Sequence, residues 1–196
     1  MRKGAKVNKI NHPAIRAALD LFAVQPYLWK HSVSLPEKTC IGEMRVLVVG
    51  FLGADRSSIC SQLRQIGVRS VASMAEVSKL KCVSGMASTF SHVVVNIDAF
   101  NCVDDAVGAL LEFRRSTRDI LIVCVSAFAS MDDFGIERSA ICEVTLRWPI
   151  GDVRLRAALV SSVENYLAVS KRDARLRVSS GVLAQLCELP PPKIGQ

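Results

Sequence analysis

The sequence predicts an α/β protein, with a doubly wound, five-stranded parallel sheet, helices on both faces and helical extensions at the ends. Three observations lead to this fold class. Short apolar segments alternate with amphipathic stretches through the middle of the chain. These segments are nearly continuous in Val and Ile, which is typical of strands buried on both faces. The 196 residues suffice for one ordinary domain with extensions, and no apolar run is long enough to span a bilayer.

The expected strands, in chain order, cover residues 45–49, 68–72, 92–95, 120–125 and 143–146. Between the first two, an apolar spacing predicts a helix with N-cap candidates at 55–58 and a stop at Gly67. A second helix contains Val107, Leu110 and Leu111 and ends on basic residues suited to its dipole, Arg114 and Arg115. The last helix has an apolar pattern formed by Val153, Ala157, Val160, Val163 and Leu167.

Functional sites of such sheets lie at the carboxyl ends of the strands, so the residues that follow each strand are the candidates. They are Gly50 and Phe51 after the first strand, Asn96 and Asp98 after the third, Ser126 and Ala127 after the fourth, and Trp148 and Pro149 after the fifth. The segment GFLGAD lacks the third glycine of a dinucleotide-binding loop, and no phosphate-binding GxxxxGK[ST] loop is present.

A family resemblance rests on the apolar segment HVVVNIDAF, on Ser-Ala after the fourth strand and on Pro-Ile after the fifth. With these features, the region from Met44 to about Tyr166 resembles the receiver domain of two-component response regulators. The resemblance implies a CheY-like (flavodoxin-like) strand order of 2-1-3-4-5 and a cis peptide before Pro149. We therefore divide the chain into a receiver-like domain at 44–169 and basic extensions at 1–43 and 170–196.

The departures from the family pattern are more informative than the matches. Gly50 and Phe51 stand where the family has its Mg²⁺-binding acidic pair, Asn96 where it has the phosphoacceptor aspartate, and Trp148 where it has a lysine. Only the hydroxyl, at Ser126, is retained. Acyl-phosphate formation needs a carboxylate nucleophile and a divalent cation held by oxygen ligands. We therefore expect no phosphotransfer to Asn96, no bound metal or other cofactor, and no enzymatic activity.

Several alternatives remain open at these positions. Asp98 would become the acceptor if the strand register slid by two residues, and Asp55 would replace the lost acidic pair if its loop folded back, although an N-cap role suits Asp55 better. Ser126 is either a hydroxyl satisfied by a strand-end backbone group or a regulatory group. Trp148 either fills, together with Phe51, the pocket that holds the phosphoacceptor site in the receiver family, or offers an aromatic anchor to a partner. We favour the first role, as a plug of that pocket.

The two extensions carry the whole net charge of +7, because residues 44–169 contain equal numbers of acidic and basic side chains. Residues 12–23 are predicted to form a helix that buries its apolar stripe on the domain, on a second copy or on a partner. The seven cysteines are scattered singly, which indicates free thiols rather than a disulfide framework or zinc site. The C-terminal extension is too short for a common DNA-binding output domain.

These observations favour a degenerate, cytoplasmic receiver-like protein that acts as a phosphorylation-independent interaction module and does not contact membranes. The expected partners are a histidine kinase, a phosphotransfer protein or another regulator, together with a second copy in a homodimer. The expected contact face covers 132–140, as the fourth helix of the domain, and 153–167. The interaction candidates are Phe22, Tyr27, Trp29, Val153, Arg156 and Val160.

One alternative function is that of a transcriptional regulator that contacts DNA weakly through its basic ends. Another is a small-ligand or phosphate sensor that uses Asp98.

Overall fold

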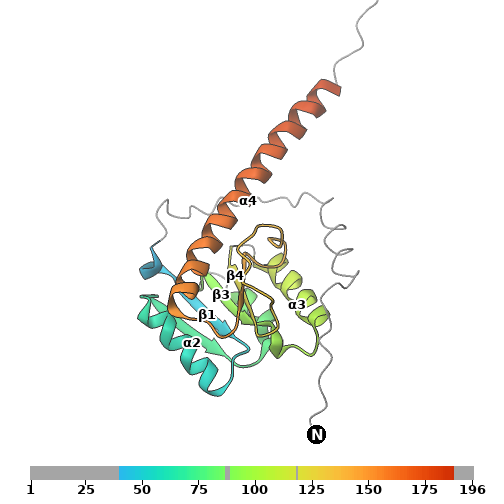
Figure 1. Cartoon of the computed structure of the whole chain (residues 1–196). Helices are drawn as coiled ribbons and strands as arrows, with labels where there is room; N and C mark the ends of the chain where they lie inside the picture. Colours follow the sequence, from blue (N-terminus) through green and yellow to red (C-terminus); the bar gives the residue numbers. More distant parts are fainter. Residues whose placement is uncertain (1–39, 87–88, 118, 188–196) are drawn as a thin grey trace, which may run out of the picture. The chain divides into compact units, whose positions relative to one another are not determined.

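The structure is a computed structural model, and it describes residues 40–86, 89–117 and 119–187. Its centre is a five-stranded, all-parallel sheet with the order β2-β1-β3-β4-β5. Figure 1 labels the three central strands, β1, β3 and β4. The strands are β1 (Arg45–Val49), β2 (Ser70–Met74), β3 (His92–Asn96), β4 (Leu121–Ser126) and β5 (Val144–Arg147). The predicted fold class, strand count and strand order are therefore confirmed, and every strand lies within two residues of its expected position.

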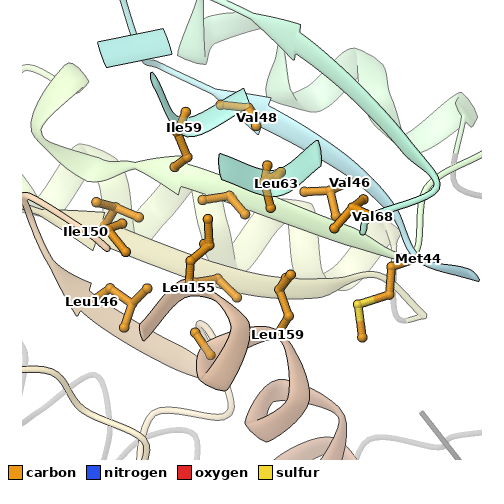
Figure 2. Close-up of a cluster of buried hydrophobic side chains, with 14 of the residues drawn as sticks. Met44, Val46, Val48, Ile59, Leu63, Val68, Leu146, Ile150, Leu155 and Leu159 are labelled. Carbon is orange, nitrogen blue, oxygen red and sulfur yellow. The ribbon is translucent and has the colours of Figure 1, made fainter. Parts of the chain in front are cut away.

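Both faces of the sheet are covered. On one face, α2 (Gly53–Gln65) and the first half of α4 (Asp152–Cys187) pack against alternate residues of β1, β3 and β4. Figure 2 shows this layer, in which Ile59 and Leu63 of α2 and Leu155 and Leu159 of α4 lie over the strands. On the other face lie α3 (Val103–Ser116) and the 3-10 helix η2 (Val77–Met86). Two shorter 3-10 helices, η1 (Ile41–Glu43) and η3 (Ile97–Ala99), precede β1 and follow β3.

The ends of α2 correct one expectation and confirm another. The helix begins at Gly53, with Leu52 at its N-cap and no side-chain cap, so residues 55–58 are not the cap. Asp55 lies instead in the exposed first turn, where its negative charge is favourable for the helix dipole. The helix ends before Gly67, whose φ of +94° is the left-handed conformation expected of a glycine stop.

The connection from β4 to β5 corrects the expected fourth helix, because residues 127–143 contain no helix. Asp133 instead forms an antiparallel bridge with Thr145 on the outer edge of β5, through two backbone hydrogen bonds of 2.7 and 2.8 Å. The Asp133 carboxylate also accepts a hydrogen bond from Gly135 N at 2.9 Å. Asp and Gly at these positions favour turns, and the pairing with β5 replaces the helix as cover for this edge.

The helix α4 also differs from expectation. Its buried face is formed by Leu155, Ala158, Leu159 and Val163, whereas Val153 is 83% exposed and Ala157 is exposed. The helix then continues without a break through the expected boundary at 169/170 to Cys187, and Figure 1 shows it extending past the edge of the sheet. Within the described residues, no helix is long and apolar enough to cross a membrane.

A buried ion pair joins α3 to the start of β5. Arg114, predicted at the basic end of its helix as a favourable charge for the helix dipole, is buried and donates to both carboxylate oxygens of Glu143 at 2.7 Å. Glu143 also accepts from Ile122 N at 2.6 Å, and Arg114 donates to Ile120 O at 2.9 Å. The pair therefore fixes the starts of β4 and β5, and both charges are hydrogen-bonded, whereas Arg114 Nε is buried without a partner among the described residues.

Six of the cysteines are free, as expected: Cys60, Cys124 and Cys142 are buried, and Cys40, Cys82 and Cys102 are exposed. Contact between Cys124 and Cys142, together with burial, raises the pKa of the Cys124 thiol. A buried thiol with a raised pKa is a poor nucleophile.

Candidate functional site

The carboxyl ends of β1, β3 and β4 bring the predicted residues together at one edge of the sheet. In the parallel register Val49 lies beside Val95, and Asn96 lies beside Val125. Gly50, Asn96 and Ser126 thus follow or end neighbouring strands. The candidate site is built from these positions and from the short helix η3 that follows β3.

Asn96 ends β3 and uses its side-chain amide to shape the loops around it. Its Oδ1 accepts from Asp98 N at 3.1 Å, and its Nδ2 donates to Gly50 O at 3.2 Å. The slid register, in which Asp98 would take the place of Asn96, is not adopted, because β3 ends at Asn96 and Asp98 lies in η3. The amide therefore closes the η3 turn and ties it to the loop after β1.

Asp98 points at the end of β4. Its Oδ1 accepts from Ser126 Oγ at 2.5 Å, and its Oδ2 accepts from Ala127 N at 2.6 Å. Both oxygens of the carboxylate thus have a donor. Ser126 is 5% exposed and also accepts from Phe128 N at 3.0 Å, so the hydroxyl links Asp98 to the backbone of the next loop. The hydroxyl is satisfied by a carboxylate and by a backbone group of its own loop, instead of the backbone group of a neighbouring strand end that was expected.

Gly50 sits where a side chain has no room. Its φ is +81°, and a Cβ placed on it would lie 2.8 Å from Val77 Cγ1 and 3.0 Å from both Ala99 Cβ and Asn96 O. The position therefore needs glycine both for its backbone conformation and for its packing. An acidic side chain at this position would clash with η2 and η3.

Phe51 and Trp148 meet beside this site. Phe51 is buried, Trp148 is half-buried, and their ring centroids lie 5.6 Å apart at an interplanar angle of 54°. This is the contact that the plug interpretation of Trp148 requires, and the tilted geometry is a favourable one for aromatic pairs. The peptide between Trp148 and Pro149 is cis, as the resemblance implied.

A magnesium ion does not fit these residues. Gly50 offers no side-chain ligand and Phe51 offers an apolar ring, whereas Mg²⁺ takes oxygen ligands in near-octahedral geometry. Asp98 is turned toward its two donors at the end of β4, Ser126 and Ala127, and Asp55 lies on α2. Within the described residues, His, Cys, Asp and Glu side chains form no cluster of three that could hold a metal ion.

A second polar cluster, which the sequence did not suggest, ties the 127–143 segment to α4. Arg154 donates to both oxygens of Asp132, at 2.7 Å from Nε to Oδ2 and through a shorter contact from its NH2 group to Oδ1. The same guanidinium donates to Arg147 O and Pro149 O. The Arg154 hydrogen bonds hold the pKa of the Asp132 carboxyl below its usual value. Because 22 residues separate the partners, no local spacing could have indicated this pair.

The predicted interaction residues are only partly described. Val153 and Arg156 are exposed near the start of α4, whereas Val160 is half-buried and packs against the core. Phe22, Tyr27 and Trp29 lie outside the described residues, as do the predicted helix at 12–23 and most of the N-terminal extension. Two large exposed side chains that the sequence did not indicate follow β4, Phe128 at 81% and Met131 at 71%.

Comparisons with known proteins connect this geometry to solved structures. No family model matches the chain, and no curated protein matches it. A putative pilus assembly-related protein from Burkholderia pseudomallei is similar with a TM-score of 0.54 and 14% identity, over 66% of this chain and 96% of that protein. NtrX from Brucella abortus, crystallised with ADP, gives a TM-score of 0.51 and 14% identity, over 71% of this chain and 30% of NtrX. A CheY-like response regulator receiver domain from Methylobacillus flagellatus gives 0.45 and 17% identity, over 61% of this chain and 98% of that domain.

At these identities the likeness concerns the fold alone, and it agrees with what the strands themselves display. Parallel strands in the order β2-β1-β3-β4-β5, with helices on both faces, are the arrangement of CheY. The described part of this chain has the CheY-like fold of response-regulator receiver domains.

Proposed function

We propose that this protein is a receiver-like regulatory module that acts through protein contacts, in signalling of the two-component type, without aspartyl phosphorylation. The observation that carries the proposal is the state of the two candidate acceptors. Asn96 is an amide, engaged at both its oxygen and its nitrogen, and Asp98 has a donor on each carboxylate oxygen. An amide does not form an acyl phosphate, and a hydrogen-bonded carboxylate that faces β4 is a poor nucleophile.

The lost metal ligands support the same proposal. Phosphoryl transfer depends on positioned cations that neutralise the charge on the moving group. Gly50 and Phe51 supply no oxygen ligand, and the packing around Gly50 opposes any larger residue there. Phe51 and Trp148 fill the neighbouring space with aromatic rings. Three positions of a phosphorylation site are thus occupied by residues with a packing role, Gly50, Phe51 and Trp148.

The contact surface that we propose lies on the 127–143 segment and the first turn of α4. Exposed apolar side chains are found there at Phe128, Met131 and Val153. The ion pair between Asp132 and Arg154 holds the two elements together. Large exposed apolar groups on a fixed backbone are typical of interaction sites. The partners we propose are a histidine kinase, a phosphotransfer protein, another regulator or a second copy of this chain, in the cytoplasm.

Acetyl phosphate with Mg²⁺ tests the proposal, with phosphorylation measured as a band shift on Phos-tag gels. The native protein and Asn96→Asp are compared with a phosphorylatable receiver treated in parallel. We expect no band shift for either protein, because restoring a carboxylate at position 96 does not restore the metal ligands. A shift of the native band that disappears in Asp98→Asn would show that Asp98 accepts phosphate and would overturn the proposal.

A further inference from the structure

The end of β4 forms a small site for an oxyanion. The hydroxyl of Ser126 and the backbone N–H of Ala127 point to the same place, and the Asp98 carboxylate occupies it at 2.5 and 2.6 Å. Both distances are short for their kind, as charge-assisted hydrogen bonds are. Ser126 is almost completely buried, so its hydroxyl has little access to water as an alternative partner. A hydroxyl and a backbone amide that donate to the two oxygens of one carboxylate are a general means of binding such an anion.

Asn96 directs the Asp98 carboxylate to this site. The Asn96 side-chain oxygen accepts from the backbone N–H of Asp98 and so closes the η3 turn. The same side chain donates to Gly50 O, which fixes its own orientation. The polar residue at the end of β3 therefore has a positioning role, which explains why an amide suits this place. An aspartate there would set a second carboxylate beside Gly50 O without a proton to share.

The hydrogen bond between Asp98 and Ser126 also fixes the conformation of the loop that follows β4. Ser126 Oγ donates to Asp98 and accepts from Phe128 N at 3.0 Å, so the carboxylate fixes the direction of the hydroxyl hydrogen and leaves its lone pair for the loop. Phe128, 81% exposed, is carried on that backbone. We propose that Asp98 is the built-in ligand of an oxyanion site formed by Ser126 and Ala127, and that it holds the Phe128 loop in one permanent arrangement. This inference rests on the proposed function, because a site already filled by the chain's own carboxylate needs no phosphoryl group.

Chemical rescue of Asp98→Ala tests this assignment. The substitution removes a carboxylate, and formate supplies that group as a free ion. Loss of two charge-assisted hydrogen bonds should lower the Tm by roughly 6 °C or more. We expect sodium formate to restore the Tm of Asp98→Ala in a saturable manner. Sodium chloride at the same ionic strength should not do so, and neither should formate added to Asp98→Ala/Ser126→Ala.

Two controls make the rescue specific. The native protein and Asp104→Ala, which removes an exposed carboxylate in the first turn of α3, should respond to formate no more than to chloride. Equal formate responses in all variants, or an unchanged Tm in Asp98→Ala, would overturn the inference.

If Asp98→Ala fails to fold, the amide proton of Ala127 in Asp98→Asn gives a second reading by NMR. A weaker hydrogen bond should move its resonance upfield, and an unmoved resonance would also overturn the inference. Native protein titrated with Mg²⁺ and beryllofluoride separates the two proposals. An adduct there contradicts the proposed function, whereas failed rescue without an adduct contradicts only the built-in ligand.

Discussion

Alanine at Gly50 should destabilise the protein far more than alanine at another glycine of the same backbone conformation. Gly50 has φ +81° and Gly67 has φ +94°, so a Cβ brings a similar backbone strain at both positions. The surroundings differ, because a Cβ on Gly67 would meet nothing within 4 Å, whereas a Cβ on Gly50 would lie 2.8 Å from Val77 Cγ1. The pair of variants therefore separates close packing from backbone conformation.

The magnitudes follow from this difference. A left-handed conformation costs a residue with a Cβ about 1–2 kcal/mol, and forcing additional atoms into a packed site costs about 1–3 kcal/mol more. Gly67→Ala should therefore lower the free energy of unfolding by about 1–2 kcal/mol, and Gly50→Ala by roughly 2–5 kcal/mol. The effect of alanine on the entropy of the unfolded chain is common to both variants and cancels in the comparison.

Urea unfolding followed by circular dichroism measures both values on the full chain. We expect a clear gap between the two variants and an unchanged slope with urea, because the same surface is exposed on unfolding. Equal costs at the two positions would refute the argument that packing excludes a side chain from position 50. The explanation for the missing acidic ligand at that position would then fail as well.

Two further predictions concern buried ionisable groups. Burial lowers the pKa of His92 from 6.5 to about 4, so between these pH values the unfolded state binds more protons than the folded state. The free energy of unfolding should fall as the pH is lowered from 6.5 to 4, by about 3 kcal/mol in all, and this slope should be absent in His92→Gln. The same slope in both proteins in urea titrations would contradict the assignment. Glu143→Gln leaves the buried Arg114 charge unpaired and should cost about 3–5 kcal/mol, whereas Glu112→Gln, at an exposed pair, should cost less than about 1 kcal/mol. Similar losses of unfolding free energy in these two variants would show that the buried ion pair stabilises the fold no more than the exposed one.

The sheet could be predicted from the sequence because its strands are buried on both faces. Continuous Val and Ile segments such as 45–49 are a local signal, and strand order follows once the family resemblance is accepted. The contact between Phe51 and Trp148 was also accessible, because parallel strand ends meet at one edge. Apolar segments in the sequence therefore predict the strands, and the parallel topology then predicts which residues meet at the strand ends.

The loops after the strands could not be predicted in the same way. Residues 132–140 were expected to form a helix, but Asp133 pairs with Thr145 on the edge of β5, a contact that depends on the finished sheet. The same holds for Arg114, whose position near a helix end indicated a dipole contact rather than an ion pair with Glu143, 29 residues away. On α4, the expected stripe placed Val153 inside because apolar spacing alone does not fix which side of a helix faces the sheet.

The role of Asp98 was the most difficult to anticipate. From the sequence it was either an acceptor in a slid register or part of a small-ligand or phosphate sensor, and the structure gives it a third role as the partner of Ser126 and Ala127. The signal was present in the spacing, since Asp98 follows Asn96 by two residues, a common distance for a side chain that closes a turn on its own backbone. The contact of the Asp98 carboxylate with Ser126 and Ala127 could not be predicted, because it depends on where the end of β4 lies relative to η3.

The most direct test of the central claim is an NMR titration of the native protein with Mg²⁺ and beryllofluoride. The amide resonances to follow are those of Gly50, Ala127 and Phe128, which surround the site. If the site is filled by Asp98 and lacks metal ligands, these resonances should not move beyond the shifts produced by the same concentrations of MgCl₂ and sodium fluoride. A saturable, Mg²⁺-dependent shift of these three amides would contradict the account and identify the protein as a phosphorylatable receiver.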